Sequence, residues 1–318
     1  MRAAVLTAPG RMRLARVPLP EPGPGELRVQ ITGCVVCASN LTPWAGADWM
    51  HFPTEPGMLG HEAWGVVDKV GPGVVGLAPG DRVATLGERS FAEAERIAAD
   101  HVVKLPGDMD GIDAVGEAVG CAMNIFSRSG IAAGQSVAII GIGFLGAILT
   151  RLATDAGAQV VAISRRPWSL ALARDHGAAE TVALDDHRRV VDAVGALAGP
   201  HGGCATVIEA TGKPWPLDLA GDLVAEGGRL VIAGYHQDGP RRINVQQWNW
   251  KGIDVVNAHE RALDRRLAGM RAGLAAVAAG RIDLQRLVTH RFPLARLGDA
   301  LDLTRDRPDG FVKAVVIP

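Results

Sequence analysis

The stretch SVAIIGIGFLGAILTRLA, residues 136–153, decides the fold of the second half of this 318-residue chain. An apolar run leads into Gly141, Gly143 and Gly146, a G-x-G-x-x-G pattern, and an apolar helical segment follows. One glycine permits a tight turn, one lets the backbone approach a pyrophosphate, and one lets the helix pack closely on its strand. The unpaired N–H groups at the start of such a helix attract anions. The stretch therefore predicts a dinucleotide phosphate loop.

Six short apolar runs alternate with helix-length segments between about residues 135 and 258. They read SVAII, QVVAIS, ETVAL, ATVIEA, RLVIAG and IDVVNA. Strands that alternate with helices predict a parallel sheet covered by helices on both faces. Six strands suit a complete, doubly wound dinucleotide-binding domain of the Rossmann type.

The first 105 residues have a different texture, with short β-branched runs broken by glycine and proline. These runs read AAVL, LRVQITG, WGVVDKVG, DRVATL and HVVKLP, and they predict a mainly β domain. After residue 258 come a predicted helix over 262–279, the run HRFPL, a second helix over 294–305 and the closing run FVKAVVIP. Because these last runs are again short and β-branched, like those of the first 105 residues, we expect the chain to return and complete the N-terminal domain.

Net charge and composition limit the classes of molecule that this protein is expected to bind. Lysine and arginine number 33 against 34 acidic residues, a net charge of −1, so no global field favours nucleic acid or an anionic membrane. The most apolar stretch, 137–149, contains three glycines and is shorter than the roughly 20 residues of a membrane-spanning helix. Four sparse cysteines and the start MRAAVLTAPG, which lacks the layout of a signal peptide, indicate a reducing, cytoplasmic setting. We expect a small-molecule ligand.

The end of the second apolar run bears on the cofactor. An NAD site usually carries an acidic residue there, which accepts hydrogen bonds from the ribose 2′-OH. This chain reads VVAISRRPW, with Ser164, Arg165 and Arg166 in that place. A hydroxyl and two guanidinium groups suit a 2′-phosphate, so we predict NADP(H) rather than NAD(H). The alternative, in which both arginines are solvated surface charges, stays open.

Two further signals lie in the β domain. Cys34 and Cys37 form a lone C-x-x-C in GCVVCASN, and His61 precedes Glu62 in PGMLGHEAWG. A single C-x-x-C is more often a buried pair or a redox motif than a zinc knuckle, and a single histidine is usually an ordinary polar residue. Their joint order along the chain carries more information than either alone.

That order, GELRVQITGCVVCASN, then GHEAWGVVDKVGPGVVGLAPGDRVA, then HVVKLP, then the glycine loop, resembles the zinc-containing medium-chain alcohol dehydrogenase family over nearly the whole chain. The resemblance implies a GroES-like, mainly β catalytic domain of residues 1–121 and 259–318. It also implies a Rossmann domain with a six-stranded parallel sheet over residues 122–258, and a zinc-dependent transfer of hydride between an alcohol or carbonyl substrate and NADP(H).

In that family a catalytic zinc has three protein ligands, which match Cys37, His61 and Glu117 here; Glu117 suggests the acidic-ligand branch that contains polyol dehydrogenases. Cys121 is the second choice for the third ligand, and Glu117 in a simple ion pair is the alternative. Three protein ligands leave a fourth position for water or substrate. The family's optional structural zinc needs four closely spaced cysteines, and none lies between Cys37 and Cys121. The resemblance thus implies one zinc per chain.

The resemblance also implies roles around the zinc. Ser39 matches the hydroxyl that relays a proton, Thr42 stands where a histidine often ends that relay, and Glu62 is expected to shape the electrostatics of the zinc. Asn40 replaces the usual aspartate behind the histidine ligand, and its amide oxygen can still orient the ring. The expected cofactor contacts are Gly141, Gly143, Phe144, Leu145, Gly146, Ser164, Arg165, Arg166, Ala210, Gly234 and Asn257.

The substrate is less well marked. The expected lining residues are Trp44, Trp49, His51, Cys121, Tyr235 and His259, although packing is an equally good interpretation of the aromatic ones. A secondary alcohol or ketone of medium size is the expected substrate, and a homodimer or homotetramer paired at the edge run GIDVVNA is the expected assembly. Two other functions remain open: a zinc-free NADPH-dependent quinone or enone reductase, and a non-catalytic NADP-binding structural or sensor protein.

Overall fold

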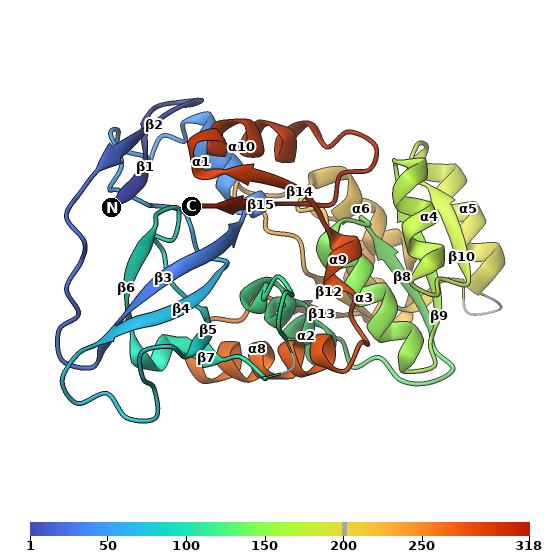
Figure 1. The fold of residues 1–318 in the computed structure, drawn as a ribbon. Coiled ribbons are helices and arrows are strands. Elements are labelled where there is room, and N and C mark those ends of the chain that lie inside the picture. The colour runs from blue at the N-terminus through green and yellow to red at the C-terminus, as the bar shows by residue number, and fades with distance from the viewer. Residues whose placement is uncertain (108, 199–201) are drawn as a thin grey trace. The chain divides into compact units, whose positions relative to one another are not determined.

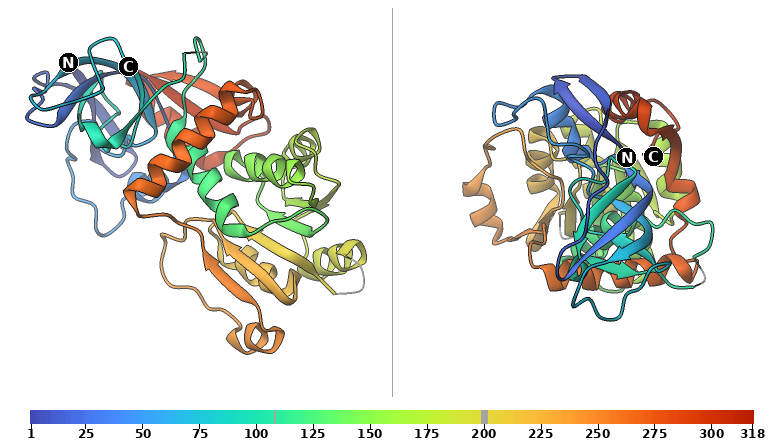
Figure 2. Two further views of the ribbon diagram at one scale, coloured as in Figure 1. Left: turned by 90° about the horizontal axis from the view of Figure 1, so that it is seen from below. Right: turned by 60° about the vertical axis from the view of Figure 1, so that its left-hand side comes forward.

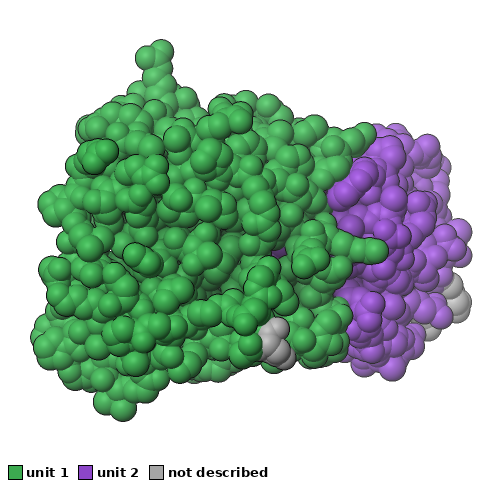
Figure 3. Space-filling view, viewed as in Figure 1, with its two compact units in different colours: residues 1–120, 262–318 green, residues 121–261 purple. Residues whose placement is uncertain are grey.

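The computed structural model describes residues 1–107, 109–198 and 202–318. The chain divides into two compact units, which Figure 3 shows in different colours. Unit 1 comprises residues 1–120 and 262–318, and unit 2 comprises residues 121–261. These limits adjoin the domain boundaries expected after residues 121 and 258.

Unit 1 is built on a seven-stranded sheet within the described chain. Its strand order is β14-β15-β3-β4-β5-β7, and β6 pairs with β3 beside this path. The strands are β3 (Glu26–Val35), β4 (Ala63–Val70), β5 (Arg82–Thr85), β6 (Ala94–Ala98), β7 (Val102–Lys104), β14 (Val288–Pro293) and β15 (Lys313–Ile317). A separate two-stranded sheet pairs β1 (Arg2–Ala8) with β2 (Arg11–Arg16).

The C-terminal segment completes this unit. β15 pairs antiparallel with β3, with Val315 opposite Val35 and Val316 opposite Cys34, and β14 runs parallel to β15. Both termini lie in unit 1 and close to each other in every view (Figure 2). The expectation that the chain returns to its N-terminal domain is therefore confirmed.

Alternating burial along β3 explains the core of unit 1. Leu27, Val29 and Ile31 point inward with relative exposures of at most 7%, and they pack with Phe91, Phe311 and other residues of one apolar cluster. Side chains two residues apart lie on the same face of a strand, so this alternation buries one face of the sheet. The helices of the unit are α1 (Leu41–Ala45), α8 (Leu263–Ala278), α9 (Leu284–Leu287) and α10 (Leu297–Asp306), and α2 (Gly116–Ser129) begins in it.

Unit 2 contains a six-stranded parallel sheet of order β10-β9-β8-β11-β12-β13 (Figure 1). Every neighbouring pair in it is parallel. The strands are β8 (Ser136–Ile140), β9 (Gln159–Ser164), β10 (Glu180–Ala183), β11 (Cys204–Glu209), β12 (Val224–Ile232) and β13 (Asp254–Asn257). Each predicted apolar run forms one strand, so the predicted Rossmann architecture is confirmed.

Helices alternate with these strands. They are α3 (Phe144–Asp155), α4 (Pro167–Asp175), α5 (His187–Ala198), α6 (Pro214–Leu223) and α7 (Val245–Lys251). Pro167 and Pro214 each occupy the first position of a helix, where the missing N–H is not needed for a helical bond. The order of the strands reverses between β8 and β11, and in such sheets ligands bind outside the carboxyl ends of the strands at this point.

The sequence does not signal β2 and β6. β2 reads RMRLAR, in which three arginines interrupt the apolar Met12 and Leu14, and among the described residues it pairs with β1 alone. β6 reads AERIA and joins the middle of β3, with Glu26 opposite Ala98. Both strands are short, and long-range pairing rather than local propensity fixes them. Among the helices of the described residues, none combines the length and apolarity that crossing a membrane requires.

Candidate metal centre and dinucleotide site

Three metal-binding side chains converge in unit 1. Ligand atoms of Cys37, His61 and Glu62 all lie within 4.8 Å of one another. Cys37 follows the end of β3, and His61 and Glu62 directly precede β4. Because β3 and β4 are antiparallel, with Cys34 opposite Ala63, the end of one strand meets the start of the other. The sheet register thus brings the two sequence signals together.

The orientation of the His61 ring suits a metal ligand. Its Nδ1 lies 2.9 Å from the carbonyl oxygen of Leu59, which can only accept a hydrogen bond, so Nδ1 carries a proton. Nε2 lies 3.5 Å from the hydroxyl of Ser39, and it is the ring nitrogen available to a cation. A hydrogen bond from the far ring nitrogen is the usual support of a metal-binding histidine.

The backbone conformation at Leu59 and Gly60 sets the direction of the Leu59 carbonyl, which accepts the hydrogen bond from His61. Leu59 has φ of 76°, a left-handed conformation that is costly for a residue with a side chain. Gly60 comes next, and a Cβ there would lie 2.3 Å from the backbone nitrogen of Phe91. The glycine of the GHE motif is therefore required by close backbone packing, and it lets the chain deliver His61 to the site.

Asn40 acts differently from the expectation. Its amide oxygen accepts from the backbone N–H of Cys37 at 2.9 Å, and its Nδ2 donates to the carbonyl of Leu59 at 3.0 Å. The prediction that its amide oxygen orients the His61 ring is wrong, because the Nδ1 of that ring donates to the Leu59 carbonyl instead. Asn40, which is 1% exposed, fixes both ligand-bearing loops through their backbones.

The charges around His61 favour a cation. Burial by itself lowers the pKa of His61, but its hydrogen bond with Cys37 and the charges of Cys37, Glu62 and Glu117 raise this pKa to about 10. The imidazole is thus held in a strongly negative surrounding. A thiol, an imidazole and carboxylates are also the donor types that zinc prefers. The residues present therefore fit a zinc ion.

A buried ion pair adjoins the centre. The ammonium of Lys313 lies 2.6 Å from Oε2 of Glu62, and the side chains are only 9% and 3% exposed. Burial lowers the pKa of Lys313, yet the charges of Glu62, Cys37 and Glu117 outweigh it and raise this pKa. Sequence analysis missed Lys313. The lysine inside the apolar run FVKAVVIP was the available signal, since a charge on a buried strand needs a partner.

Glu117 lies outside the group of three ligand atoms. It stands in the first turn of α2, and its Oε1 is 3.6 Å from a guanidinium nitrogen of Arg266. It is close enough to His61 and Lys313 to raise the pKa of both. Cys121, its alternative, lies one turn further along α2, half-buried. Ligation by Glu117 remains a prediction.

The other residues expected near the zinc and the substrate lie in different surroundings: some near the metal centre, one in the core and others at the surface. Ser39 lies beside His61, as described above, and Thr42 lies half-buried in α1. Trp44 is 3% exposed in the core of unit 1 and donates from its indole nitrogen to Asp302 at 2.9 Å. Because this ring is enclosed by core residues, the interpretation of Trp44 as a substrate contact is wrong. Trp49, 57% exposed, and His51 lie at the surface.

In unit 2 the glycine loop has the expected strand-turn-helix setting. Gly141 follows β8 with φ of 98°, and a Cβ on it would lie 2.5 Å from Cγ2 of Thr211. A Cβ on Gly146 would lie 2.0 Å from the carbonyl oxygen of Gly141. Gly143 caps the start of α3, and the space beside it is open. Two glycines thus permit packing, and the third leaves room beside the helix start. Phe144 and Leu145 form the first turn of α3.

The remaining residues expected to bind the cofactor lie at the carboxyl ends of strands. Ser164 ends β9, exposed Arg165 follows it, and Arg166 caps α4. Ala210 follows β11, Gly234 follows β12, and Asn257 ends β13. Beyond them, the rings of Tyr235 and His259 are stacked with centroids 5.7 Å apart.

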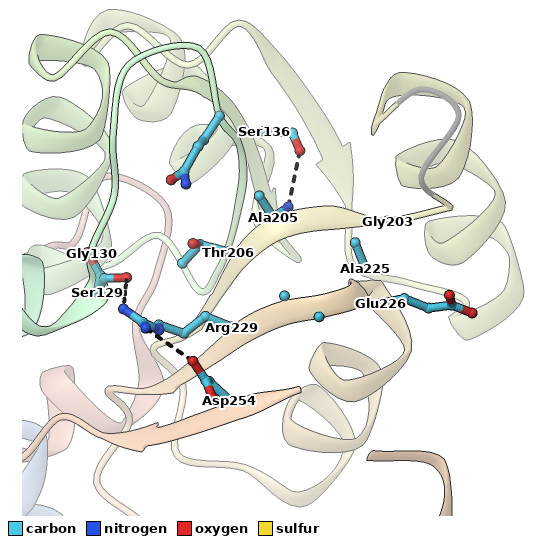
Figure 4. Close-up of a pocket in the computed structure, with 13 residues that line it drawn as sticks. Ser129, Gly130, Ser136, Gly203, Ala205, Thr206, Ala225, Glu226, Arg229 and Asp254 are labelled. Atoms are coloured by element: carbon cyan, nitrogen blue, oxygen red, sulfur yellow. Dashed lines mark hydrogen bonds and ion pairs between the residues drawn. The ribbon is translucent and has the colours of Figure 1, made fainter. Parts of the chain in front are cut away.

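A separate pocket lies at the opposite edge of this sheet (Figure 4). It has a volume of about 370 Å³, and its lining includes Ser136, Arg229 and Asp254. Ser136 and Asp254 are the first residues of β8 and β13, so the pocket lies at the amino ends of the strands. Arg229 donates across it to the carbonyl of Ser129 at 3.3 Å and to Asp254 at 3.2 Å. A dinucleotide is not expected at this edge.

Two family models match the chain. The model of the alcohol dehydrogenase GroES-like domain matches residues 23–107, and that of the zinc-binding dehydrogenase matches residues 145–270. The alcohol dehydrogenase of Geobacillus stearothermophilus is 32% identical over 269 residues, which cover 74% of this chain and 77% of the relative. The sorbitol dehydrogenase of Gallus gallus is 28% identical over 344 residues, with 95% and 93% covered.

Solved structures agree. A protein of Sinorhizobium meliloti 1021 described as a zinc-binding dehydrogenase, solved bound to NADP, is 28% identical, with a TM-score of 0.83 over 100% of this chain and 99% of its own. The alcohol dehydrogenase of Thermus sp. ATN1 is 25% identical, with a TM-score of 0.84 over the same shares. Together with the Cys37 and His61 loops and the Rossmann unit, these likenesses lead to one conclusion. The chain is an oxidoreductase that belongs to the zinc-containing medium-chain alcohol dehydrogenase family.

Proposed function

We propose that this protein is a zinc-dependent alcohol dehydrogenase, or ketone reductase in the reverse direction, that uses NADP(H) in preference to NAD(H). The observation that carries the proposal is the group of Cys37, His61 and Glu62, together with the hydrogen bond from His61 Nδ1 to Leu59, which leaves Nε2 available to a metal. This donor set excludes neither of the other two functions by itself, but a zinc-free reductase or a scaffold has no need of it.

Within this function, Cys37, His61 and Glu117 hold one zinc per chain. Glu62 is nearer to the other two than Glu117, yet the ammonium of Lys313 at 2.6 Å already balances its charge. Glu117 lies 3.6 Å from a guanidinium nitrogen of the partly exposed Arg266. A carboxylate that a buried ammonium already balances is the poorer candidate for the third ligand, because zinc would have to replace that interaction.

The residues around the metal centre have separate roles in the proposed reaction. Zinc, when bound, supplies a Lewis acid that lowers the pKa of an alcohol or polarises a carbonyl. The Ser39 hydroxyl, 3.5 Å from His61 Nε2, accepts and passes on the substrate proton, and Thr42 lies three residues further along the same segment. Glu62, neutralised by Lys313, sets the charge behind the ligands without competing for the zinc.

The cofactor is assigned to unit 2, with residues 122–258 as the cofactor domain and the remainder as the catalytic domain. The end of β9 carries the hydroxyl of Ser164 and the guanidinium groups of Arg165 and Arg166. NAD sites usually have a carboxylate at this place, and it would repel a 2′-phosphate. The Sinorhizobium meliloti relative, which was solved bound to NADP, supports this assignment.

The relatives support a substrate class, and the edge of the cofactor sheet supports an assembly. The name of the Gallus gallus relative, sorbitol dehydrogenase, supports a polar secondary alcohol or the matching ketone as the substrate class. Among the described residues the edge strand β13 pairs with β12 alone, and Val255 on it is 39% exposed. An open edge of this kind suits pairing with a second copy in a homodimer or homotetramer. The four free cysteines suit a reducing cytoplasm.

The test is the zinc content per chain, measured by elemental mass spectrometry on protein purified without added metal, for the wild type and for Cys37→Ser, Glu117→Gln and Glu62→Gln. We expect a value near one for the wild type and for Glu62→Gln, and depletion in the other two. Loss of zinc in Glu62→Gln with retention in Glu117→Gln would move the third ligand to Glu62.

Turnover of alcohols and ketones with NADP(H), with and without a chelator, completes the test. We expect turnover that the chelator abolishes and added zinc restores. A wild type that lacks zinc, regains none on addition, and is nevertheless active would establish the zinc-free reductase. A wild type that binds NADP(H) but turns over no substrate would establish the scaffold.

A further inference from the structure

A buried carboxylate organises the loop after β11. Glu209, the last residue of that strand, is fully buried. Its Oε1 accepts from the backbone nitrogens of Thr211 at 2.6 Å and Gly212 at 2.9 Å, and also from the Thr211 hydroxyl. Three donors thus converge on one carboxylate oxygen. It therefore fixes the turn 210–213 as a rigid unit.

His236 connects this carboxylate to the loop after β12. Its Nε2 lies 2.9 Å from Oε2 of Glu209, and Nε of Arg241 lies 2.8 Å from its Nδ1. Arginine can only donate, so Nδ1 accepts from Arg241 and Nε2 donates to Glu209. The imidazole thus has a single arrangement, in which one side accepts from Arg241 and the other donates to Glu209.

Arg241 closes the connection between the two loops. Its Nη2 donates to the carbonyl of Gly212 at 3.2 Å and to the carboxylate of Asp238, and its side chain is 12% exposed. Lys213 also reaches Asp238, at 3.2 Å. The backbones themselves are in close contact, because a Cβ on Gly234 would lie 2.1 Å from the nitrogen of Gly212. The loops 210–213 and 233–241 are therefore one interlocked structure.

This structure lies beside the phosphate loop. The methyl group of Thr211 blocks the space where a Cβ of Gly141 would stand, at 2.5 Å. β11 is the strand next to β8 across the point where the strand order reverses. In a doubly wound sheet each half holds one mononucleotide. The glycine loop and the β9 end form the adenosine half, which leaves the loops after β11 and β12 to receive the nicotinamide half.

We propose that His236 and Arg241 are positioning residues for the nicotinamide half of the cofactor: through Glu209 they hold the loops 210–213 and 233–241 in the one arrangement that receives it. The inference rests on the proposed use of NADP(H). It assigns neither residue a contact with the reacting atoms. It predicts that loss of the network weakens binding of the whole dinucleotide while binding of its adenosine half is kept.

The experiment measures equilibrium binding by calorimetry, with NADPH and with adenosine 2′,5′-bisphosphate as the two probes. His236→Leu removes both hydrogen bonds at similar size. We expect its NADPH affinity to fall by at least about tenfold, as loss of buried hydrogen bonds implies, while adenosine bisphosphate affinity changes less than about twofold. His236→Gln offers an amide donor and acceptor and should recover most of the NADPH affinity. A thermal melt of each variant checks the fold.

A second variant guards against a misfolded first one. Arg241→Gln removes the outer end of the network and leaves the Glu209 bonds to Thr211 and Gly212. It should show the same selective loss of NADPH affinity, smaller than in His236→Leu.

Unchanged NADPH affinity in both variants would overturn the inference, as would an equal loss for both probes, which would indicate a general role in the fold. A wild type that binds neither NADPH nor NADH would overturn the proposed function, and the inference with it. If the wild type binds NADH instead, the comparison is made with NADH and ADP, so a wrong cofactor preference does not decide the positioning role.

Discussion

Asn40 and His61 donate to the same oxygen, the carbonyl of Leu59, at 3.0 Å from Nδ2 and 2.9 Å from Nδ1. Since Asn40 also accepts from the backbone of Cys37, one buried amide positions the backbones of both ligand-bearing loops through two hydrogen bonds. The ring of His61 is therefore oriented by a carbonyl that is itself held in place.

Replacing Asn40 by leucine should lower both stability and zinc affinity. The change leaves the Cys37 N–H without its acceptor and the Leu59 carbonyl without one of its two donors, at a cost of about 1–3 kcal/mol in unfolding free energy. Loss of support behind a metal ligand should weaken zinc binding by roughly ten- to a hundredfold. Chemical denaturation and a competition titration with a zinc chelator measure the two effects.

Thr54→Val is the matched control for that change. Thr54 is buried in the same unit and accepts from the backbone of Leu6 at 3.0 Å. It should lose similar stability but no zinc affinity. If both variants lost zinc affinity to the same degree, the effect of Asn40 would be one of general stability.

The Glu62–Lys313 pair should show strong coupling. Lys313→Met alone leaves a buried carboxylate without its counter-ion and should destabilise unit 1 by about 3–5 kcal/mol. The double variant Glu62→Gln/Lys313→Met removes both charges and should recover much of this loss. Urea unfolding of the four proteins of the cycle gives the coupling energy. The exposed Asp302–Arg305 pair is the control, with a coupling of at most about 1 kcal/mol.

The limits of sequence analysis are visible in these two clusters. Cys37 and His61 could be predicted, because each stands in a local motif whose order along the chain is distinctive. Lys313 could not be paired with Glu62, since the two are joined only by the register that sets β15 beside β3 and β3 beside β4. Local patterns identify elements and their order, whereas partners across a sheet depend on register.

The cofactor unit was more predictable than the metal centre for the same reason. Its central strands β8, β9 and β11 are mostly apolar and buried, as burial on both faces of a parallel sheet requires. The glycine loop is contiguous in sequence. Its polar network was not foreseen, because Glu209, His236 and Arg241 come from two different loops and the pattern of apolar runs says nothing about them.

The glycines of the phosphate loop should separate stability from cofactor binding. Gly146→Ala places a Cβ 2.0 Å from the carbonyl oxygen of Gly141 and should destabilise unit 2 by about 1–3 kcal/mol. Gly143→Ala meets nothing within 4 Å, with φ of −108°, so stability should change by less than about 1 kcal/mol. If a pyrophosphate approaches Gly143, this variant should nevertheless bind NADPH more weakly. Melting curves and NADPH titrations test both; unaltered NADPH binding by Gly143→Ala would place the phosphates elsewhere.

Cofactor preference should depend on the two arginines after β9. In Arg165→Gln/Arg166→Gln the KM for NADPH should rise by roughly ten- to a hundredfold, because a charged hydrogen bond to phosphate contributes about 1.5–3 kcal/mol. The KM for NADH should change little, since NADH carries no 2′-phosphate. Steady-state kinetics with both cofactors measure the ratio, and Arg174→Gln, on the same helix α4, is the control. Equal rises for both cofactors would refute the preference for NADP(H).

Cys204 should make the protein less stable at alkaline pH. Burial raises the pKa of this thiol to about 11, against 9.0 in an unperturbed thiol, although a hydrogen bond with Ser136 opposes the rise. Between these values the unfolded chain releases a proton that the folded chain keeps, so the free energy of unfolding is full below about pH 9 and falls toward pH 11. Two pH units correspond to a loss of at most about 3 kcal/mol in the free energy of unfolding.

Urea unfolding of the wild type and of Cys204→Ala across this pH range measures how steeply stability declines in each. Replacement of the half-buried Cys121 by alanine is the control. Because the buried Cys34 has a raised pKa as well, Cys204→Ala should flatten the decline without abolishing it. A decline as steep in Cys204→Ala as in the wild type would show that other groups govern alkaline stability.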